Sequence, residues 1–446
     1  MNYQLAPREI PLHDGFDVIV VGGGPAGITA AVSSAREGKK TLLIEATGAL
    51  GGMSTMGMVP AWCPFSDKEK IIYRGLAERI FKEGKAATPH VPDEMLDWVP
   101  ISSEALKVIY DRICTEFGVK VLFNTVLSDV DAENGSINAI IVSNKAGLSA
   151  YKAKIYIDCT GDADLSFFAG AETVKGDGED STALQPATHC FSIGNVDPAA
   201  YKSGPWLHSS NKESPVHKVV ADDEFPSVTD PHLCSCVTLG SGTVGFNAGH
   251  VNGLDGTDPD ALSDALMLGR EKAHELLAGL KKYHPLGAFD NAYVQTTASL
   301  MGIRETRRVV CDYKLNRDDY MARRSFPDEI ARNCYYIDLH MTPEQKAAAG
   351  GNVGEKRAAR YGKGESHGIP YRCLTPVGFD NLLVAGRIVW CDRDLLASVR
   401  VMPNCLTTGE AAGLAASMAI DAGVSVHEIN TDTLRETLRG YGAYMN

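Results

Sequence analysis

The strongest hydrophobic pattern of the chain lies near its N-terminus. An apolar run over 16–21 leads into the glycine-rich segment 22–27, and a run of small, helix-compatible residues follows and ends at Gly38. A second apolar run, 41–44, ends on Glu45. Strand, glycine-rich turn, helix, strand and acid in this order are typical of a dinucleotide-binding βαβ unit. The pattern therefore predicts a parallel sheet with a nucleotide at its edge.

Each glycine of this turn has its own task. Gly22 lets the chain turn off the strand, Gly24 lets a pyrophosphate approach the backbone, and Gly27 lets the helix pack close to the strand. The free N–H groups and the positive end of the helix favour phosphates. Glu45 is expected to accept a hydrogen bond from a ribose hydroxyl, and its charge disfavours the 2′-phosphate of NADP.

Helical and strand periods alternate along the next hundred residues. Amphipathic periodicity predicts helices over 67–83 and 102–117. Ser102 or Ser103 is the expected cap of the second helix, and Gly118 is its expected stop. Strand-like alternation follows, with a turn at 133–135, and a further buried strand runs into a Thr-Gly-Asp turn; these stretches are 119–142 and 154–162.

The composition changes between residues 181 and 290, where Gly, Pro, Ser, His and Asp accumulate and short strands such as 188–193 and 234–239 appear antiparallel. Asp258 and Pro259 then open a helix that continues to about Lys282. Parallel-sheet character returns at 381–386, and a helix of small residues begins at about Asn404. Its face of Gly409, Ala412, Gly413 and Ala416 is expected to let a cofactor or the sheet approach closely, and plain tight packing is the alternative.

A second glycine-rich stretch, 240–245, also fits the dinucleotide fingerprint. The residues after it, 246–253, do not have a helical pattern, and the fingerprint needs a helix at this place. We interpret the stretch as a hairpin or loop.

Composition and charge narrow the possible classes. The chain has 446 residues and a net charge of −13, which disfavours nonspecific binding to nucleic acid. No apolar run approaches the ~18 residues of a membrane-spanning helix. The N-terminal residues have no apolar signal segment, so we expect a cytoplasmic location. The eleven cysteines form no Cys-x-x-Cys pair, so we expect reduced thiols, no metal site and no flavin–disulfide reductase.

Three features favour FAD over NAD as the nucleotide. The doublet Gly51-Gly52 follows the acidic strand at once, and the strand-to-turn segment 157–162 comes much later. The C-terminal part adds 381–387 and then 400–404 before a helix. An extended flavin nucleotide needs such a return of the chain, whereas a nicotinamide nucleotide does not.

These segments resemble the FAD-dependent oxidoreductase superfamily, which includes the flavoproteins of fumarate reductase and succinate dehydrogenase. The closer resemblance is to a branch known simply as FAD-dependent oxidoreductases. It rests on 245–247, 255–259, 299–308, 369–372 and 381–413. That branch often carries Thr-His-Glu where this chain has Asp392-Arg393-Asp394, which leaves the proton-transfer residue open.

The resemblance and the motifs together imply a Rossmann-like FAD-binding α/β domain with an inserted α+β cap. We expect the FAD domain over 1–180 and 291–446, with an excursion at about 311–365, and the cap over 181–290. No histidine lies between residues 51 and 65, so we expect noncovalent FAD. The expected FAD-binding residues are Gly22, Gly24, Pro25, Ala26, Gly27, Glu45, Ala46, Gly51, Gly52, Met53, Thr160, Gly161, Asp162, Gly386, Arg387, Met402, Pro403 and Asn404.

Arg400 is the main candidate for binding substrate. Arg400 and Asn404 keep the Arg-x-x-x-Asn spacing of fumarate reductases, in which the arginine grips the substrate carboxylate. A buried guanidinium needs a partner, and a substrate anion would supply it. The alternative is a salt bridge to Asp392 or Asp394.

The other candidates for chemistry are Arg304, His189 and Tyr371. Arg304 belongs to a charged cluster that either lines the pocket or forms an internal ion-pair network. His189 has a side chain suited to proton transfer near neutral pH, although a structural role is the alternative. Tyr371 is expected to line the same cavity with Arg372.

We therefore expect an enzyme that transfers hydride between a small polar substrate and flavin N5. Three alternatives stay open: a fumarate-reductase-like enoate reductase, a noncatalytic flavin-binding protein, and an NAD-only dehydrogenase. The expected partners are a small-molecule substrate and an electron donor or acceptor of unknown kind, and a homo-oligomer is compatible with the sequence. Nucleic acid and membrane partners are not expected.

Overall fold

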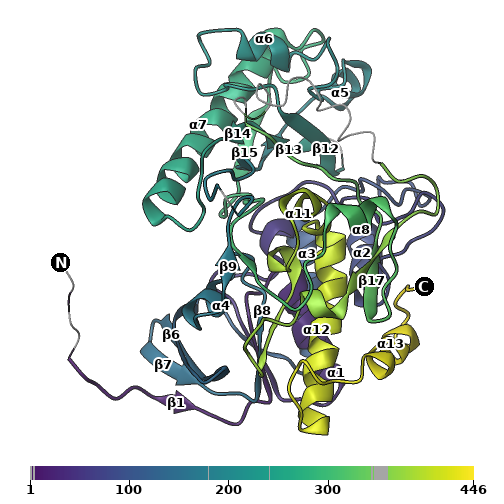
Figure 1. Ribbon diagram of the computed structural model, residues 1–446. Coiled ribbons are helices and arrows are strands. Elements are labelled where there is room, and N and C mark those ends of the chain that lie inside the picture. Colours follow the sequence, from purple (N-terminus) through teal and green to yellow (C-terminus); the bar gives the residue numbers. More distant parts are fainter. Residues whose placement is uncertain (1–2, 4–5, 179, 241, 343–344, 346–359) are drawn as a thin grey trace.

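The computed structural model describes residues 3, 6–178, 180–240, 242–342, 345 and 360–446. These residues form a large body and a smaller cap above it (Figure 1). The largest buried apolar cluster belongs to the body, and a separate cluster between Phe191 and Ala292 fills the cap.

A five-stranded parallel sheet in the order β19-β8-β2-β3-β4 forms the centre of the body. Its strands are β2 Val18–Val21, β3 Thr41–Ile44, β4 Lys120–Leu122, β8 Ile155–Asp158 and β19 Leu382–Val384. Four of them are buried throughout, as expected for a sheet covered on both faces. Because every pairing is parallel, the carboxyl ends of the strands share one edge. The predicted α/β class is confirmed.

Two helices from opposite ends of the chain pack against each other on one face of this sheet. They are α1 Pro25–Arg36 and α12 Met402–Ala422. A Cβ on Gly409 would overlap the Ala26 carbonyl, and one on Gly413 would overlap the Ala30 carbonyl. The small-residue face of α12 therefore serves helix–helix packing. At these two glycines the structure shows tight packing against α1 in place of the expected approach of a cofactor or the sheet.

Further elements of the body surround the sheet. A second sheet, in the order β1-β7-β6-β5, covers its other face with the apolar cluster that includes Ile19, Ile140 and Tyr156. The remaining elements of the body are β1 Leu12–His13, α2 Leu76–Ala86, α3 Ser103–Glu116, β5 Val126–Glu133, β6 Ser136–Asn144, β7 Gly147–Tyr151, α4 Asp164–Phe168, β9 Thr173–Val174, β16 Arg308–Val309, α8 Arg317–Met321, β17 Glu329–Asn333, β18 His367–Pro370, α11 Arg393–Val399 and α13 Thr431–Gly440, with short 3₁₀ turns at Gly52–Ser54, Tyr371–Cys373 and Gly386–Ile388.

The cap consists of an antiparallel sheet, β12-β13-β11-β15, and the long helix α7 Pro259–Tyr283, on which Ala273, Leu276 and Leu280 face the sheet. Its other elements are β10 Ala187–Thr188, β11 Phe191–Gly194, α5 Pro198–Ser203, α6 Val216–Val220, β12 Leu233–Leu239, β13 Thr243–Ala248, β14 His250–Val251 and β15 Tyr293–Thr297. The cap contacts the body at 56–60: the Ser299 N–H donates to the Met56 carbonyl at 2.9 Å, and Cys236 Sγ donates to the Pro60 carbonyl at 3.1 Å.

Two predicted helices differ from this structure in where they begin. The first amphipathic helix begins at Leu76 and not at residue 67. The Asp67 carboxylate accepts from the N–H groups of Glu69 and Lys70 and so holds a turn that competes with helix formation. The small-residue helix α12 begins at Met402, two residues before the expected start, because Pro403 suits a first helical turn.

The predicted cap and stop of α3 and the predicted hairpin agree with the structure. Ser102 caps α3, and Gly118, with φ +73°, follows its end. The stretch 240–245 belongs to the β12–β13 hairpin, in which Leu239 pairs with Thr243, and Ser241 is outside the described residues. Residues 343–344 and 346–359 of the expected excursion are outside them too. Among the described helices, none has the length and apolar character that crossing a bilayer requires.

Candidate functional site

The glycine-rich turn lies at the carboxyl edge of the sheet, between β2 and α1. Gly22 has φ +98°, and a Cβ there would overlap the Cys159 carbonyl oxygen. A Cβ on Gly27 would overlap the Gly22 carbonyl, so α1 packs directly against the turn. A Cβ on Gly24, by contrast, would have no heavy atom of the described residues within 4 Å. The turn is therefore tightly packed on one side and open at Gly24.

The start of α1 borders this open space. Within the described residues, no side chain caps the helix at Gly24, so its first N–H groups face outward. Glu45, at the end of β3, accepts hydrogen bonds from the Gly23 N–H and the Thr47 N–H, both at 2.7 Å. These bonds fix the carboxylate beside the turn and leave each oxygen a second lone pair.

Residues from two other segments lie against the start of α1. The Gly51 N–H donates to the Gly23 carbonyl at 2.8 Å, and a Cβ on Gly52 would lie 3.1 Å from the Gly24 Cα. On the other side, a Cβ on Gly386 would lie 3.1 Å from the Ala26 Cβ. The structure thus places the Gly51-Gly52 doublet and the turn after β19 around the start of α1.

The Thr-Gly-Asp turn after β8 is fixed by a buried acid. The Asp158 carboxylate accepts from the backbone and hydroxyl of both Thr160 and Ser166. Burial raises the pKa of Asp158, while these hydrogen bonds oppose the rise. Asp162 then pairs with Arg387 at 2.7 Å, which joins this turn to the one after β19.

The start of α12 is a second helix N-terminus in this region. No side chain of the described residues caps it, and Pro403 lies in its first turn. Asn404 is fully buried, and its Nδ2 donates to the Val399 carbonyl at 2.8 Å. Its Oδ1 is buried and has no hydrogen-bond partner among the described residues. A buried acceptor without a donor is costly, and a donor on a bound ligand would satisfy it.

The model for the family described as "FAD dependent oxidoreductase" matches residues 17–438. The chain belongs to this family. It is an oxidoreductase, and its cofactor is FAD.

Curated proteins resemble parts of the chain. Thiamine thiazole synthase of Methanococcus aeolicus is 30% identical over 155 residues, which are 32% of this chain and 54% of that protein. The cytochrome fumarate reductase of Shewanella frigidimarina is 42% identical over 62 residues, which are 13% of this chain and 11% of that protein. The chain thus spans about half or less of these curated relatives. These partial matches leave membership of the fumarate reductase superfamily a proposal.

A solved structure aligns over more of the chain. p-Nitrophenol 4-monooxygenase of Pseudomonas putida DLL-E4 covers 96% of this chain and 87% of its own, at a TM-score of 0.49 and 13% identity.

The carboxyl edge fits an extended FAD. Gly24 leaves room for a pyrophosphate, the free N–H groups of α1 suit its charge, and Asn404 Oδ1 lacks a donor. A hollow of about 790 Å³ opens at the opposite edge of the sheet, near Lys154 and Asn381. We do not assign the nucleotide to it, because ligands of open α/β sheets bind at the carboxyl ends of the strands.

Arg304 and Arg400 meet where the cap faces the FAD domain. Arg304 is 7% exposed; its Nη1 donates to the Pro186 carbonyl at 2.6 Å and to Thr188 Oγ1 at 2.7 Å. Burial, together with the charge of Arg400, lowers the pKa of Arg304 to about 10. Arg304 therefore keeps its charge at neutral pH, and the two guanidinium groups are close enough to interact.

Arg400 follows α11 and precedes α12. Its Nη2 donates to the Asp338 carbonyl at 3.3 Å, and its Nε is buried without a hydrogen-bond partner among the described residues. The expected alternative, a salt bridge to a neighbouring acid, is not formed: Asp392 caps α11, and Asp394 pairs with Arg317 at 3.0 Å. Throughout the described part of the chain, no carboxylate forms a salt bridge with Arg304 or Arg400.

The carboxylate of Asp338 interacts electrostatically with both arginines. Burial opposes its ionisation, but His340, Arg400 and Arg304 together hold its pKa below the ordinary value. Cys63 belongs to the same surroundings, and burial raises the pKa of its thiol to about 12. The thiol is therefore protonated at neutral pH.

The structure does not bring His189 to this place. Its neighbour Thr188 faces Arg304, and consecutive residues of an extended chain point to opposite sides. His189 packs against Gly269 of α7, and its Nε2 bonds to the Ala298 carbonyl at 2.8 Å. Burial lowers the pKa of His189. These contacts correspond to the structural alternative.

Tyr371 lies far from Arg400. The Tyr371 hydroxyl donates to the Val426 carbonyl at 2.7 Å, beyond the C-terminal end of α12, whereas Arg400 precedes its N-terminal end. A helix of 21 residues separates these ends by about 30 Å at 1.5 Å per residue.

Other side chains near these segments serve structural contacts. Arg372 pairs with Asp328 at 2.9 Å. Trp62 and Phe65 pack with Phe81 in the aromatic core.

Two groups of this region were not predicted from the sequence. Asp338 lies beside the arginine pair, and His232, His250 and His340 form a cluster next to it. Neither group has a local motif, because their members come from separate segments. Only a contact map would have found them.

Proposed function

We propose that the protein transfers a hydride between a small anionic organic substrate and N5 of noncovalently bound FAD. The FAD would lie along the carboxyl edge of the sheet, with its pyrophosphate at Gly24 and the start of α1. The proposed binding residues are the eighteen expected from the sequence, from Gly22 through Asn404. Their support is the meeting of five segments at one edge, with an open place at Gly24.

The observation that carries the substrate proposal is the pair Arg304 and Arg400. Arg304 is buried and Arg400 is half-buried; their like charges repel each other, and neither has a salt bridge among the residues described. A substrate carboxylate would neutralise part of this charge and form charge-assisted hydrogen bonds. We therefore assign anion binding and orientation to both arginines.

The bound flavin supplies the chemistry that accepts or donates a hydride. The uncapped start of α12 provides N–H groups and a positive dipole end, which stabilise negative charge nearby. Oxidation of the substrate removes a hydride and a proton together. The contacts of His189 and Tyr371 argue against both as the proton acceptor, so the proton-transfer group is not assigned.

Reduction of an unsaturated carboxylate is the second candidate. It is favoured by the Arg400–Asn404 spacing and by the short match to fumarate reductase. Both candidates need the same arginine pair and differ in the direction of hydride transfer. A cytoplasmic location and a homo-oligomeric state stay predictions of the sequence.

An anaerobic panel of organic acids, read at the flavin absorbance, tests the proposal. Saturated hydroxy acids that bleach oxidised enzyme support the first reaction. Unsaturated acids that reoxidise reduced enzyme support the second. Neutral amides of the same compounds serve as matched controls, because they lack the charge that the arginines would bind. If amides and acids react equally well, the anion proposal is wrong.

A further inference from the structure

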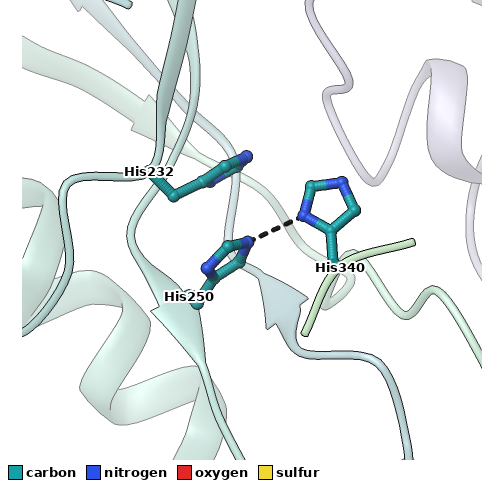
Figure 2. A group of neighbouring side chains, drawn as sticks. All are labelled: His232, His250 and His340. Atoms are coloured by element: carbon teal, nitrogen blue, oxygen red, sulfur yellow. Dashed lines mark hydrogen bonds between the residues drawn. The ribbon is translucent and has the colours of Figure 1, made fainter. Parts of the chain in front are cut away.

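Three histidines from separate segments converge between the cap and the body (Figure 2). His232 precedes β12, His250 begins β14, and His340 belongs to the segment between β17 and β18. His250 Nε2 and His340 Nδ1 lie 2.9 Å apart, and the rings of His232 and His250 stack with their centroids at 4.0 Å. One ring nitrogen of each residue lies within 4.8 Å of the other two.

Each of two histidines also has a carboxylate at its other ring nitrogen. Asp230 Oδ1 lies 3.2 Å from His250 Nδ1, and Asp338 Oδ2 lies 3.3 Å from His340 Nε2. Metal-binding histidines characteristically donate their second N–H to a carboxylate, which fixes the tautomer and directs the free lone pair at the metal. Here this arrangement occurs twice in one cluster.

The two inner nitrogens of the cluster are close enough to bind one central ion. His250 Nε2 and His340 Nδ1 form a hydrogen bond of 2.9 Å, so one of these two nitrogens holds the proton between them. A carboxylate accepts only, so Asp338 favours a proton on His340 Nε2 and a lone pair on Nδ1. A metal ion at the centre would replace the proton of the hydrogen bond between the two rings.

The third histidine supplies a further ring nitrogen to the cluster. His232 Nδ1 is buried without a hydrogen-bond partner among the described residues. The His232 ring stacks on the His250 ring and so lies against the hydrogen-bonded pair. Neutral imidazole binds metals through an unprotonated ring nitrogen.

We propose that His232, His250 and His340 bind a divalent transition-metal ion of the zinc class. Three imidazoles without thiolates suit Zn²⁺, Fe²⁺, Co²⁺ or Ni²⁺, and three protein ligands leave a coordination position for water. The site is independent of the proposed reaction. It also departs from the expectation of no metal, which rested on the absence of Cys-x-x-Cys pairs.

Small side-chain movements would complete the geometry. Tetrahedral zinc with bonds of about 2.0–2.1 Å places its nitrogens about 3.3 Å apart. The His250–His340 separation of 2.9 Å would widen slightly, and the His232 ring would tilt out of its stack on His250. Arg304 opposes a cation here, and the carboxylates of Asp230 and Asp338 offset its charge.

Zinc uptake by the full-length flavoprotein tests the site. The protein is first treated with a chelator, then equilibrated with Zn²⁺ by dialysis, and bound zinc is measured by elemental analysis. We expect one equivalent per chain. His250→Gln and His340→Gln should lose this equivalent, and Asp338→Asn should weaken binding by roughly 10–100-fold.

His274→Gln is the matched control, because His274 lies exposed on α7. It should bind zinc as the wild type does. Flavin content and the unfolding midpoint show that each variant is folded, independently of turnover. Cobalt in place of zinc adds a second readout, since nitrogen ligation gives d–d bands without thiolate charge-transfer bands. A wild type that takes up no zinc, or zinc that survives both glutamine variants, overturns the proposal.

Discussion

The carboxyl edge of the sheet and the junction under the cap are neighbouring regions built in different ways. At the edge, backbone groups and glycines define the space: the turn at Gly22–Gly27 packs tightly, and Gly24 stays open. At the junction, long charged side chains define it, with Arg304, Arg400 and Asp338 from three distant segments. Side-chain substitutions can change the shape of the edge little, because its walls are backbone and glycine. They can change the shape and charge of the junction strongly, because side chains form its walls.

This difference matches the division of work in a flavoprotein. A cofactor shared by a whole family needs a constant cradle, and backbone N–H groups supply it whatever the side chains are. A substrate is specific to each member, and side chains on an inserted cap supply that specificity. The two regions should therefore respond differently to mutation.

The largest expected effect is at the edge, for Gly24→Val. Because a Cβ at Gly24 would meet open space, the variant should fold, while its branched side chain fills the place of the pyrophosphate. We expect FAD content to fall to background with the secondary structure intact. The absorbance of the purified protein and circular dichroism measure both quantities.

Gly440→Val is the matched control, since Gly440 also has open space around its Cβ and lies at the end of α13, away from the edge. It should keep its flavin. A yellow Gly24→Val protein with normal FAD content would mean that the nucleotide binds elsewhere. The edge would then not be the cofactor site, and its contrast with the junction would fail.

The next effect concerns the junction, for Arg400→Ala. One charged hydrogen-bonding partner is worth about 1.5–3 kcal/mol, so kcat/KM for an anionic substrate should fall roughly ten- to over one hundredfold. FAD content should not change, because the arginine binds substrate in our proposal. Steady-state kinetics and flavin content are measured on the same sample.

Arg74→Ala provides the comparison for Arg400→Ala. Its side chain is 48% exposed and pairs with Glu78 on the surface, so both kinetics and flavin content should match the wild type. Equal kinetics of Arg400→Ala and wild type would remove Arg400 from substrate binding.

The sequence predicted the edge far better than the junction, and the reason is physical. The edge depends on local spacing: glycines at 22, 24 and 27, then an acid at 45, fix turn, helix and strand in order. The junction depends on long-range contacts, such as the 90 residues between His250 and His340. Arg400 was found through a motif, whereas Asp338 has none.

Local competition explains the errors within the fold. The helix expected from residue 67 starts at Leu76, because Asp67 holds a turn through its own side chain. The glycines of α12 were expected to admit a cofactor or the sheet, but they pack against α1. Periodicity shows that a helix face consists of small residues. It does not show which neighbouring element packs against that face.

The smallest expected effect is at Thr188, which touches no substrate in our proposal. Its Oγ1 accepts a hydrogen bond from Arg304 Nη1 at 2.7 Å, and its side chain is buried. Thr188→Val removes that acceptor while the Pro186 carbonyl still holds Arg304. A hydrogen bond of about 0.5–1.5 kcal/mol corresponds to a roughly two- to twelvefold loss in kcat/KM.

The effect at Thr188 should appear in KM rather than in kcat, because a loosened Arg304 binds the anion less well without altering the flavin. Thr188→Ser keeps the hydroxyl and should restore the wild-type KM, which separates the hydrogen bond from the loss of packing. A Thr188→Val enzyme with unchanged KM toward an anionic substrate would mean that Arg304 is held by the backbone alone. Substrate specificity at the junction would then depend on Arg400. Arg400 would be the one side chain by which the junction differs from the backbone-built edge.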